Sequence, residues 1–466
     1  MANTTIAIIS VAALFVLVLG GVHIGFALIV TSLVTMIFVT GSLEIAGDLL
    51  AATAYSGVRD YVFAVVPLFI LMGAFMTNCR AAEALFAAVN FLFRKLRGGL
   101  GVATVYANAV FAAVTGVSVA SAAVFSTIAY PQMSRYGYSK RLALGSVAGS
   151  SVLGMLIPPS LLMILYGILT QVSIGALFIA GIIPGILLAV LYSVGIIIIG
   201  YRRPHMVGAG GNTQVPTIDV GEAVPTSTDV VVNDPEAEVD ATPAERGPET
   251  FRAAVVGAIP IVMLVVLVIG GIWGGIFSPT EASAVGAVGA LVIAPFMGMD
   301  WKRFFSSFSQ TAVSTGAILF LLIAAQAYSR MLASSGLVGR VEQFINNLAV
   351  SEFVIILIFV IILVVMGAVL DSSSIILLAV PLMYPSIQLL GVDPIWFGII
   401  LIVAVEIGLL TPPFGMVPFA MSAVLGKRAT VEDIFIGSLP FLVVMVIFLG
   451  ILLAFPSLST WLPNLL

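Results

Sequence analysis

Cysteine and histidine are nearly absent from this chain of 466 residues, which contains one cysteine (Cys79) and two histidines (His23 and His205). A single cysteine excludes a secreted fold that is held together by disulfides. Two histidines, with no His-Glu-x-x-His motif and no paired cysteines, provide too few ligands for a transition-metal enzyme. The sequence therefore predicts neither a resident metal nor an organic cofactor.

Charged side chains are also scarce, at 9% of the residues, whereas soluble proteins contain about 25%. The chain has no basic stripe long enough to follow a phosphate backbone, which argues against nucleic-acid binding. Apolar residues make up 61% of the chain, and a soluble protein of this length has no core large enough to bury them. Membrane lipid is therefore expected to surround most of the protein, and we predict an all-α polytopic membrane protein.

Residues 204–250 differ in composition from the rest of the chain. They hold nine of the 22 acidic residues and a single base, Arg246, and they are rich in Pro, Thr, Val and Gly without a helical or strand period. This composition is typical of a disordered, solvated linker, which we place in the cytoplasm. An acidic tail with a function of its own is the alternative. The linker separates two hydrophobic halves, residues 1–203 and 251–466.

The two halves present the same order of apolar segments. Each contains two long apolar blocks that glycine, serine or proline interrupts midway. Gly116 precedes Gly367 by 251 residues, and Pro158 precedes Pro412 by 254. The same order at a nearly constant offset indicates an internal repeat. Each repeat is predicted to contain a hairpin and then a broken helix, at residues 99–131 and 142–171 in the first half and at 353–385 and 395–425 in the second.

Lysine and arginine predict how the repeats are oriented. The first hairpin has basic residues on both flanks, at 94–97 and 135–141, whereas Glu352 and Asp393 flank the second. We therefore expect the first hairpin to open to the cytoplasm and the second to open to the outside, so that neither crosses the membrane. Each half then crosses five times, and this odd number inverts the second repeat. Besides the two broken helices, the predicted crossings are residues 5–19, 23–40, 61–78, 174–200, 253–276, 280–297, 305–327 and 434–455. Both termini are expected on the periplasmic side.

Inverted repeats with interrupted helices are typical of secondary transporters. Unwound backbone is tolerated at membrane depth only where it is buried in protein or lines a cavity. There its carbonyl oxygens can bind a cation, and the N-terminal ends of half-helices can face an anion. Hydroxyl groups gather around the four breaks, and such neutral oxygen ligands suit Na⁺, although small residues also permit close helix packing. The hydroxyls belong to Ser118, Ser121, Ser146, Ser150, Ser151, Ser372, Ser373, Ser374 and Thr411.

Two acidic residues lie at membrane depth near the breaks. Asp371, in the tip of the second hairpin, can cap the returning helix, help to hold a cation, or do both. Glu406 precedes the second proline break and is a candidate coupling residue, because an ionisable group inside a span is a functional candidate by default. The alternative for Glu406 is a position that faces an aqueous vestibule. Arginines near span ends can bind a substrate carboxylate or anchor helices at the membrane interface. They are Arg59, Arg80, Arg330 and Arg340.

Five segments carry a resemblance to a known family. They are Val66–Gly73, Thr115–Ser121, Gly154–Ser160, Ser278–Ala282 and Gly408–Gly415. In this order they resemble the large membrane subunit of tripartite ATP-independent periplasmic (TRAP) transporters, which belong to the ion transporter superfamily. The resemblance runs through both halves, and the acidic linker alone is longer than the family pattern.

The resemblance implies an elevator mechanism, in which the hairpins and broken helices slide as a unit against a scaffold of the other helices. It also implies uptake that is coupled to a Na⁺ gradient, and substrates that are organic acids such as C4-dicarboxylates or sialic acid. The implied partners are a periplasmic substrate-binding protein and a small four-helix membrane subunit. The implied location is the bacterial cytoplasmic (inner) membrane.

The resemblance also assigns site residues, because the family's cation sites lie at the hairpin tips and in the adjoining unwound helices. The implied Na⁺ ligands are Gly116, Ser118, Ser150, Ser151, Gly154, Gly367, Asp371, Ser372 and Thr411. The implied substrate contacts are Ser118, Ser121, Pro158, Ser160, Ser373, Thr411, Pro412 and Gly415.

Three other functions are compatible with a membrane protein of this kind. A single-chain Na⁺/carboxylate or gluconate-type symporter would share the fold and need no binding protein. A membrane-embedded enzyme is disfavoured, because the sole cysteine has no nearby histidine and two isolated acids do not make a catalytic pair. A channel is the third alternative, and flux that saturates and follows the Na⁺ gradient would argue against it.

Overall fold

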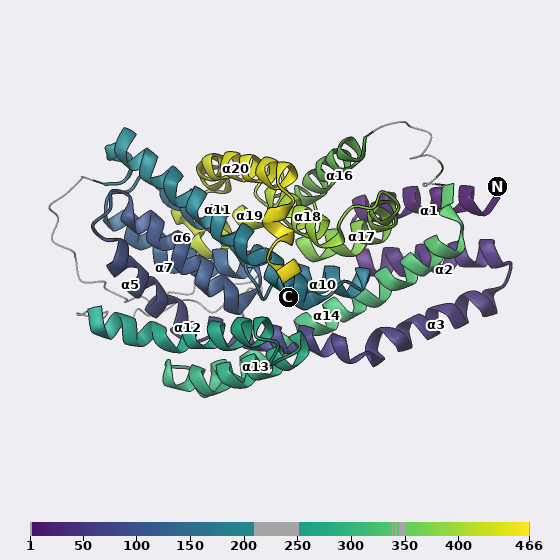
Figure 1. Ribbon diagram of the computed structural model, residues 1–466, viewed down its shortest axis with the longest axis horizontal. Helices are drawn as coiled ribbons and strands as arrows, with labels where there is room; N and C mark the ends of the chain where they lie inside the picture. Colours follow the sequence, from purple (N-terminus) through teal and green to yellow (C-terminus); the bar gives the residue numbers. More distant parts are fainter. Residues whose placement is uncertain (1, 209–250, 338, 341–342, 344–350, 466) are drawn as a thin grey trace.

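The computed structural model describes residues 2–208, 251–337, 339–340, 343 and 351–465 (Figure 1). Within these ranges the regular structure is helical, apart from an isolated bridge between Tyr138 and Val207. The all-helical prediction is therefore confirmed for the described part of the chain. Most of the predicted acidic linker lies outside the described residues.

The first half contains the predicted hairpin and broken helix together with the helices that precede and follow them. Before the hairpin lie α1 (Ala2–Leu19), α2 (Ile24–Thr40), α3 (Leu43–Arg59), the 3₁₀ turn η1 (Tyr61–Ala64), α4 (Val65–Thr77) and α5 (Ala81–Phe93). The hairpin arms are α6 (Gly99–Thr115) and α7 (Ser118–Arg135), and the broken helix comprises α8 (Lys140–Ser151), α9 (Leu153–Leu156) and α10 (Leu161–Thr170). The half ends with α11 (Ile174–Arg202) and η2 (Pro204–Met206).

The second half follows the same order. It begins with α12 (Phe251–Trp273), α13 (Pro279–Phe296) and α14 (Trp301–Ser334). The second hairpin consists of α16 (Glu352–Gly367) and α17 (Ser372–Leu389), and the second broken helix of α18 (Pro394–Leu409) and α19 (Met416–Leu425). The short η3 (Gly426–Arg428), α20 (Val431–Ala454), α21 (Ser457–Thr460) and η4 (Pro463–Leu465) complete it.

Local chemistry explains where the interrupted helices end and begin again. Gly116 follows α6 with a φ of 64°, a left-handed conformation that favours glycine. Asp371 caps α17, because its Oδ2 accepts a hydrogen bond of 3.0 Å from the backbone N–H of Ser374. Ser160 caps α10 in the same way, since its Oγ accepts from the N–H of Met163 at 3.4 Å. The breaks therefore lie at the glycine, serine and proline positions that the sequence indicates.

Fewer helices are long enough to cross a membrane than the sequence predicts. In the described part of the chain seven helices have the necessary length and composition, or eight if α3 and α4, which are bent by 57° at η1, form one span. Helix α2 has 17 residues and is about 26 Å long, less than the roughly 30 Å of a hydrocarbon core. The ten predicted crossings therefore remain a prediction. Helices α3 and α5 were not predicted, because Glu44 and Asp48 in α3, and the short length of α5, weaken their hydropathy signal.

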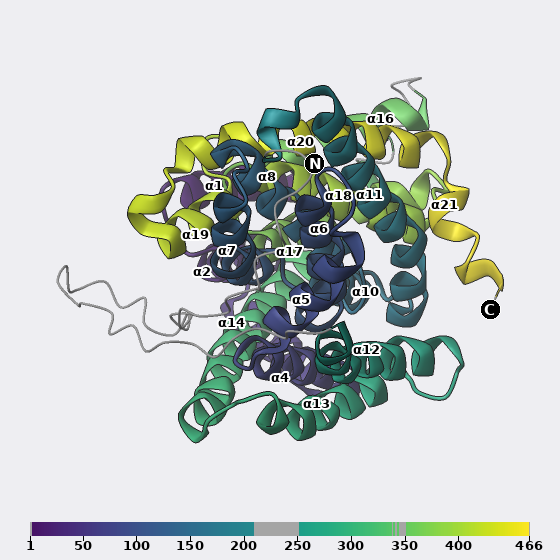
Figure 2. The same ribbon diagram turned by 90° about the vertical axis from the view of Figure 1, so that its left-hand side faces the viewer.

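The helices form two groups, and Figure 2 shows α4, α12 and α13 of one group on the opposite side of the molecule from α8, α18 and α20 of the other. One group brings together α4, α12, α13 and α14 with α2 and α3. In the other group, helices of the first half pack against helices of the second half: α8 on α20, α7 on α19, α10 on α17, and α11 on α18. The two groups touch where α14 packs against α17 and where α4 and α12 pack against α6. The hairpins and broken helices of both halves therefore share one core.

The two halves meet backbone to backbone where α8 crosses α20. A Cβ atom at Gly145 would collide with the carbonyl oxygen of Gly437, and one at Gly437 would collide with the carbonyl oxygen of Arg141. An ion pair of 2.7 Å between Lys140 Nζ and Asp433 Oδ2 lies beside this crossing. A Cβ atom at either position would meet the backbone of the other helix, so glycine at both allows α8 and α20 to pack this closely.

Candidate functional site

The tip of the first hairpin touches the break of the first broken helix. The carbonyl oxygen of Gly116 accepts a hydrogen bond of 3.3 Å from the N–H of Leu161, two residues after the proline pair. On the other side of the tip, a Cβ atom at Gly154 would lie 3.2 Å from the backbone nitrogen of Ser118. Glycine at both places allows the unwound tip and the unwound break to pack against each other.

The second half repeats this contact. The carbonyl oxygen of Ala368, in the second tip, accepts a hydrogen bond of 3.1 Å from the N–H of Phe414, directly after the second proline pair. The backbones of Gly367 and Gly408 also meet, since a Cβ atom at Gly367 would lie 2.7 Å from the Cα atom of Gly408. In both halves the structure therefore brings the predicted tip residues next to the predicted break.

A buried hydrogen bond connects the two halves at this place. Ser118 Oγ donates to Glu406 Oε1 at 2.9 Å, across 288 residues of sequence. Ser118 is 0% exposed and Glu406 is 1% exposed. Glu406 therefore does not face an aqueous vestibule in this structure. Its second oxygen, Oε2, has no hydrogen-bond partner within the described part of the chain.

The predicted hydroxyl ligands of the first half are buried and bonded within the protein. Ser150 Oγ accepts a hydrogen bond of 2.9 Å from Asn108 Nδ2, and Ser151 Oγ donates to the carbonyl oxygen of Ala148 at 2.8 Å. Ser121 Oγ lies 3.2 Å from the hydroxyl of Thr115. Asn108 was missed by the sequence analysis, although an amide within an apolar block is a recognisable signal. Its Oδ1 is buried without a partner among the described residues.

The second tip and break are more open than the first. Pro158 is buried, whereas its counterpart Pro412 is exposed. Asp371, the cap of α17, is exposed as well, while Ser372 is buried and Ser373 is half-buried. Polar groups at the second tip thus remain accessible, whereas those at the first tip are enclosed.

The remaining predicted residues act on the backbone near the breaks. Thr411 Oγ1 donates to the carbonyl oxygen of Ile407 at 2.7 Å, one turn back along α18. Gly415 precedes α19, and a Cβ atom there would lie 2.6 Å from the carbonyl oxygen of Leu409. Both residues therefore shape the second break itself.

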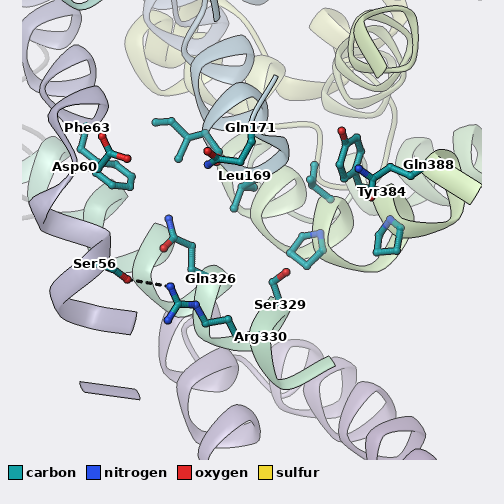
Figure 3. Close-up of a pocket in the computed structure, with 14 residues that line it drawn as sticks. Ser56, Asp60, Phe63, Leu169, Gln171, Gln326, Ser329, Arg330, Tyr384 and Gln388 are labelled. Carbon is teal, nitrogen blue, oxygen red and sulfur yellow. Dashed lines mark hydrogen bonds between the residues drawn. The ribbon is translucent and has the colours of Figure 1, made fainter. Parts of the chain in front are cut away.

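A separate polar cavity lies away from the tips (Figure 3). Its volume is about 440 Å³, and its walls come from α3 and η1, the end of α10, α14 and α17. Among these residues the sequence analysis had considered Arg330 alone, because the others stand in separate segments and form no motif. The polar residues of the lining are Ser56, Asp60, Gln171, Gln326, Ser329, Arg330, Tyr384 and Gln388.

Comparison with known proteins gives a match over nearly the whole chain. Residues 11–458 match the family described as tripartite ATP-independent periplasmic transporter, DctM component. The chain is 32% identical to the C4-dicarboxylate TRAP transporter large permease protein DctM of Pseudomonas aeruginosa, over 89% of each chain. It is 27% identical to the sialic acid TRAP transporter large permease protein SiaM of Vibrio cholerae, over 96% of each chain.

Two further comparisons concern a longer relative and a solved structure. The isethionate TRAP transporter permease protein DctMQ of Oleidesulfovibrio alaskensis is 28% identical over 96% of this chain but 64% of its own length. The structure of the YdaH transporter of Alcanivorax borkumensis superposes with a TM-score of 0.58 at 14% identity, over 89% of both chains. At that identity the likeness concerns the fold alone.

Proposed function

Because this chain belongs to the DctM component family of tripartite ATP-independent periplasmic transporters, we propose that it imports a small organic acid with the help of a Na⁺ gradient. As a large permease of this family the chain is a multi-pass membrane transporter and not an enzyme. The names of its relatives support an organic-acid substrate, since they include C4-dicarboxylate and sialic acid permeases. The finer claims concern the mechanism, the coupling ion and the partners.

The observation that carries the mechanism is the pair of tip–break contacts. Each half places an unwound hairpin tip against an unwound break, with matching hydrogen bonds to Gly116 and to Ala368. In the proposed elevator these elements move together against the group that contains α4, α13 and α14. The shared core of the hairpins and broken helices supports such a unit, and the order of elements supports inverted repeats.

The oxygen atoms around the tips support Na⁺ as the coupling ion. Carbonyl and hydroxyl oxygens suit a monovalent hard cation, and the carboxylate of Asp371 is exposed at the second tip. Near the first tip, Glu406 Oε2 and Asn108 Oδ1 are buried oxygens without a partner among the described residues. We place the Na⁺ ligands and the substrate contacts at these two tips.

A periplasmic substrate-binding protein and a small membrane subunit complete the proposed system. The tripartite description of the family supports both. The isethionate relative supports the small subunit in particular. Its name combines M and Q, and this chain spans 64% of its length, so the remainder is long enough to include a second, smaller component.

Uptake into proteoliposomes tests this function. Vesicles that contain the full chain and its small subunit receive an inward Na⁺ gradient and a candidate binding protein, with radiolabelled succinate or N-acetylneuraminate as substrate. We expect uptake that needs both the gradient and the binding protein. Uptake without a binding protein would instead favour a single-chain symporter, and flux that does not saturate would favour a channel.

The inverted orientation predicts that two introduced thiols react from opposite sides of the membrane. Ser134, in the last turn of α7, and Leu389, at the end of α17, are both exposed. We expect Ser134→Cys to react with an impermeant maleimide only after the membrane is permeabilised, and Leu389→Cys to react in intact cells. The native Cys79 is buried, so its background reaction is low. Labelling of both variants from one side would refute the inversion.

A change at the second tip is expected to alter the requirement for Na⁺. Asp371→Ala should raise the Na⁺ concentration for half-maximal uptake roughly tenfold, equivalent to about 1.4 kcal/mol, because a carboxylate near the ion is removed. The matched control is Asp393→Ala, since Asp393 also caps a helix, by accepting from the N–H groups of Ile395 and Trp396. The control should lose cap stability without a change in Na⁺ dependence. An equal effect of the two variants would assign Asp371 to capping alone.

A further inference from the structure

The cavity in Figure 3 contains a guanidinium group that the protein leaves largely unused. Arg330 projects from α14, and one of its nitrogens donates to Ser56 Oγ at 3.1 Å. Within the described part of the chain Arg330 forms no ion pair. A guanidinium has five N–H donors in a planar fork that matches a carboxylate. The remaining donors of Arg330 are therefore suited to a carboxylate of a ligand.

A second charged residue lines the same cavity and restricts the ligand further. Asp60 Oδ1 accepts a hydrogen bond of 3.1 Å from the N–H of Val62, and no salt bridge joins Asp60 to Arg330 among the described residues. A second carboxylate on the ligand would be repelled by Asp60, whereas hydroxyl, amide or ammonium donors would be attracted. The remaining titratable group of the lining is the phenol of Tyr384, which is uncharged at neutral pH.

The rest of the lining has mixed hydrogen-bonding character. Gln171 follows α10, Gln326 lies in α14 and Gln388 lies in α17, and each amide can both donate and accept. The volume of about 440 Å³ falls in the range of roughly 300–1,000 Å³ that small-molecule sites occupy. The lining is thus equipped for a polar molecule with several hydrogen-bonding groups.

From this arrangement we propose that the cavity is a recognition site for a small organic acid that carries one carboxylate, held by Arg330, and several hydrogen-bond donors at its other end. The site is separate from the hairpin tips: the lining residues of α17 begin at Val380, 8 residues or about 12 Å from Ser372, and extend to Gln388, 16 residues or about 24 Å from it. This inference rests on the proposed function. In the proposed orientation the second hairpin opens to the outside of the membrane. The cavity lies toward that open end and therefore on the side from which an importer receives its substrate.

The walls of the cavity come from both groups of helices. Residues from α10 and α17 belong to the group that contains the hairpins, while α3 and α14 belong to the other group. An elevator movement would separate these walls, so the cavity would hold its ligand in one state of the cycle and release it in the other. It therefore selects the substrate before the tips bind it.

The reaction rate of a thiol introduced into the cavity wall tests the site independently of transport activity. Ser329 is half-buried beside Arg330, and Ser329→Cys in the full-length chain is treated with an anionic or a cationic methanethiosulfonate. Introducing Arg330→Gln into this variant should lower the ratio of the anionic to the cationic reaction rate about tenfold, because one nearby positive charge is lost. N-acetylneuraminate and gluconate, which carry one carboxylate and several hydroxyls, should slow the reaction more than succinate does at the same concentration.

The matched control is a neighbouring arginine that does not line the cavity. Arg59 lies with its Cζ atom 5.9 Å from the centroid of the Tyr55 ring, and Arg59→Gln should leave the rate ratio and the protection unchanged. An unchanged ratio in the Arg330→Gln background would overturn the proposal. Stronger protection by succinate than by both monocarboxylates would overturn the assigned ligand class.

Uptake measurements separate this inference from the proposed function. In the complete system, Arg330→Gln should raise the substrate concentration for half-maximal uptake about tenfold and leave the maximal rate within about twofold, because only the initial recognition is weakened. If the unaltered chain shows no Na⁺-driven uptake, the proposed function fails while the thiol experiment still decides the site. If uptake is normal and Arg330→Gln matches Arg59→Gln in both assays, the cavity site fails alone.

Discussion

Glu406→Gln is expected to reduce Na⁺-driven uptake roughly 10–100-fold, the effect of losing about 1.5–3 kcal/mol from an interaction of a charged group. The amide oxygen can still accept the hydrogen bond that Ser118 Oγ donates to Glu406 Oε1. What the substitution removes is the ionisable carboxyl group and its second oxygen Oε2, which is buried and has no partner among the described residues. The measurement is uptake at several Na⁺ concentrations, together with the apparent melting temperature of each variant.

A second buried carboxylate gives the control for this experiment. Glu83 in α5 also has a buried oxygen without a partner among the described residues, but it lies outside the tips and breaks. Glu83→Gln should therefore leave the Na⁺ dependence of uptake unchanged. If Glu406→Gln transports normally with the same Na⁺ dependence, the carboxylate has a structural role and the coupling assignment is wrong.

The largest effect on stability is expected at the crossing of α8 and α20. Gly437→Ala places a methyl group against the carbonyl oxygen of Arg141, and backbone cannot move aside as the end of a side chain can. Overpacking of a core costs about 1–3 kcal/mol when side chains can adjust, so we expect a loss of at least about 2 kcal/mol here. Size-exclusion chromatography after heating measures the loss as a lower apparent melting temperature.

The same helix supplies a matched substitution. Gly450 in α20 has open space around it, with no heavy atom within 4 Å of an added Cβ. Gly450→Ala should leave the melting temperature unchanged or raise it, because alanine favours a helix over glycine by up to about 1 kcal/mol. Equal melting temperatures for the Gly437 and Gly450 variants would show that α8 and α20 are not held at this distance.

The sequence predicts local features of the site and misses those that depend on packing. The tips and breaks are encoded by residues such as Gly116 and Pro158, whose effect on the backbone is independent of distant neighbours. The hydrogen bond between Ser118 and Glu406 spans 288 residues, and both residues were candidates without any signal that they meet. The fold class, by contrast, follows directly from the apolar composition of the chain.

The polar cavity was even less predictable from the sequence, because it forms only when distant segments pack together. Its walls come from four separate segments, and glutamines such as Gln326 carry no motif. Arg330 was visible in the sequence as one of several arginines near span ends, but sequence alone does not separate an interfacial anchor from a ligand-binding residue. Helix α3 was missed because its acidic residues lower its hydropathy although it packs against other helices.

The packing of the two halves has a consequence for biosynthesis. Ser118 emerges from the ribosome 288 residues before Glu406, which at about 5–20 residues per second corresponds to roughly 15–60 s. During this interval α7, α8 and α10 lack α19, α20 and α17, the helices against which they pack in the finished protein. The nascent first half must therefore be shielded in the membrane, by the insertion machinery or by lipid, until the second half arrives.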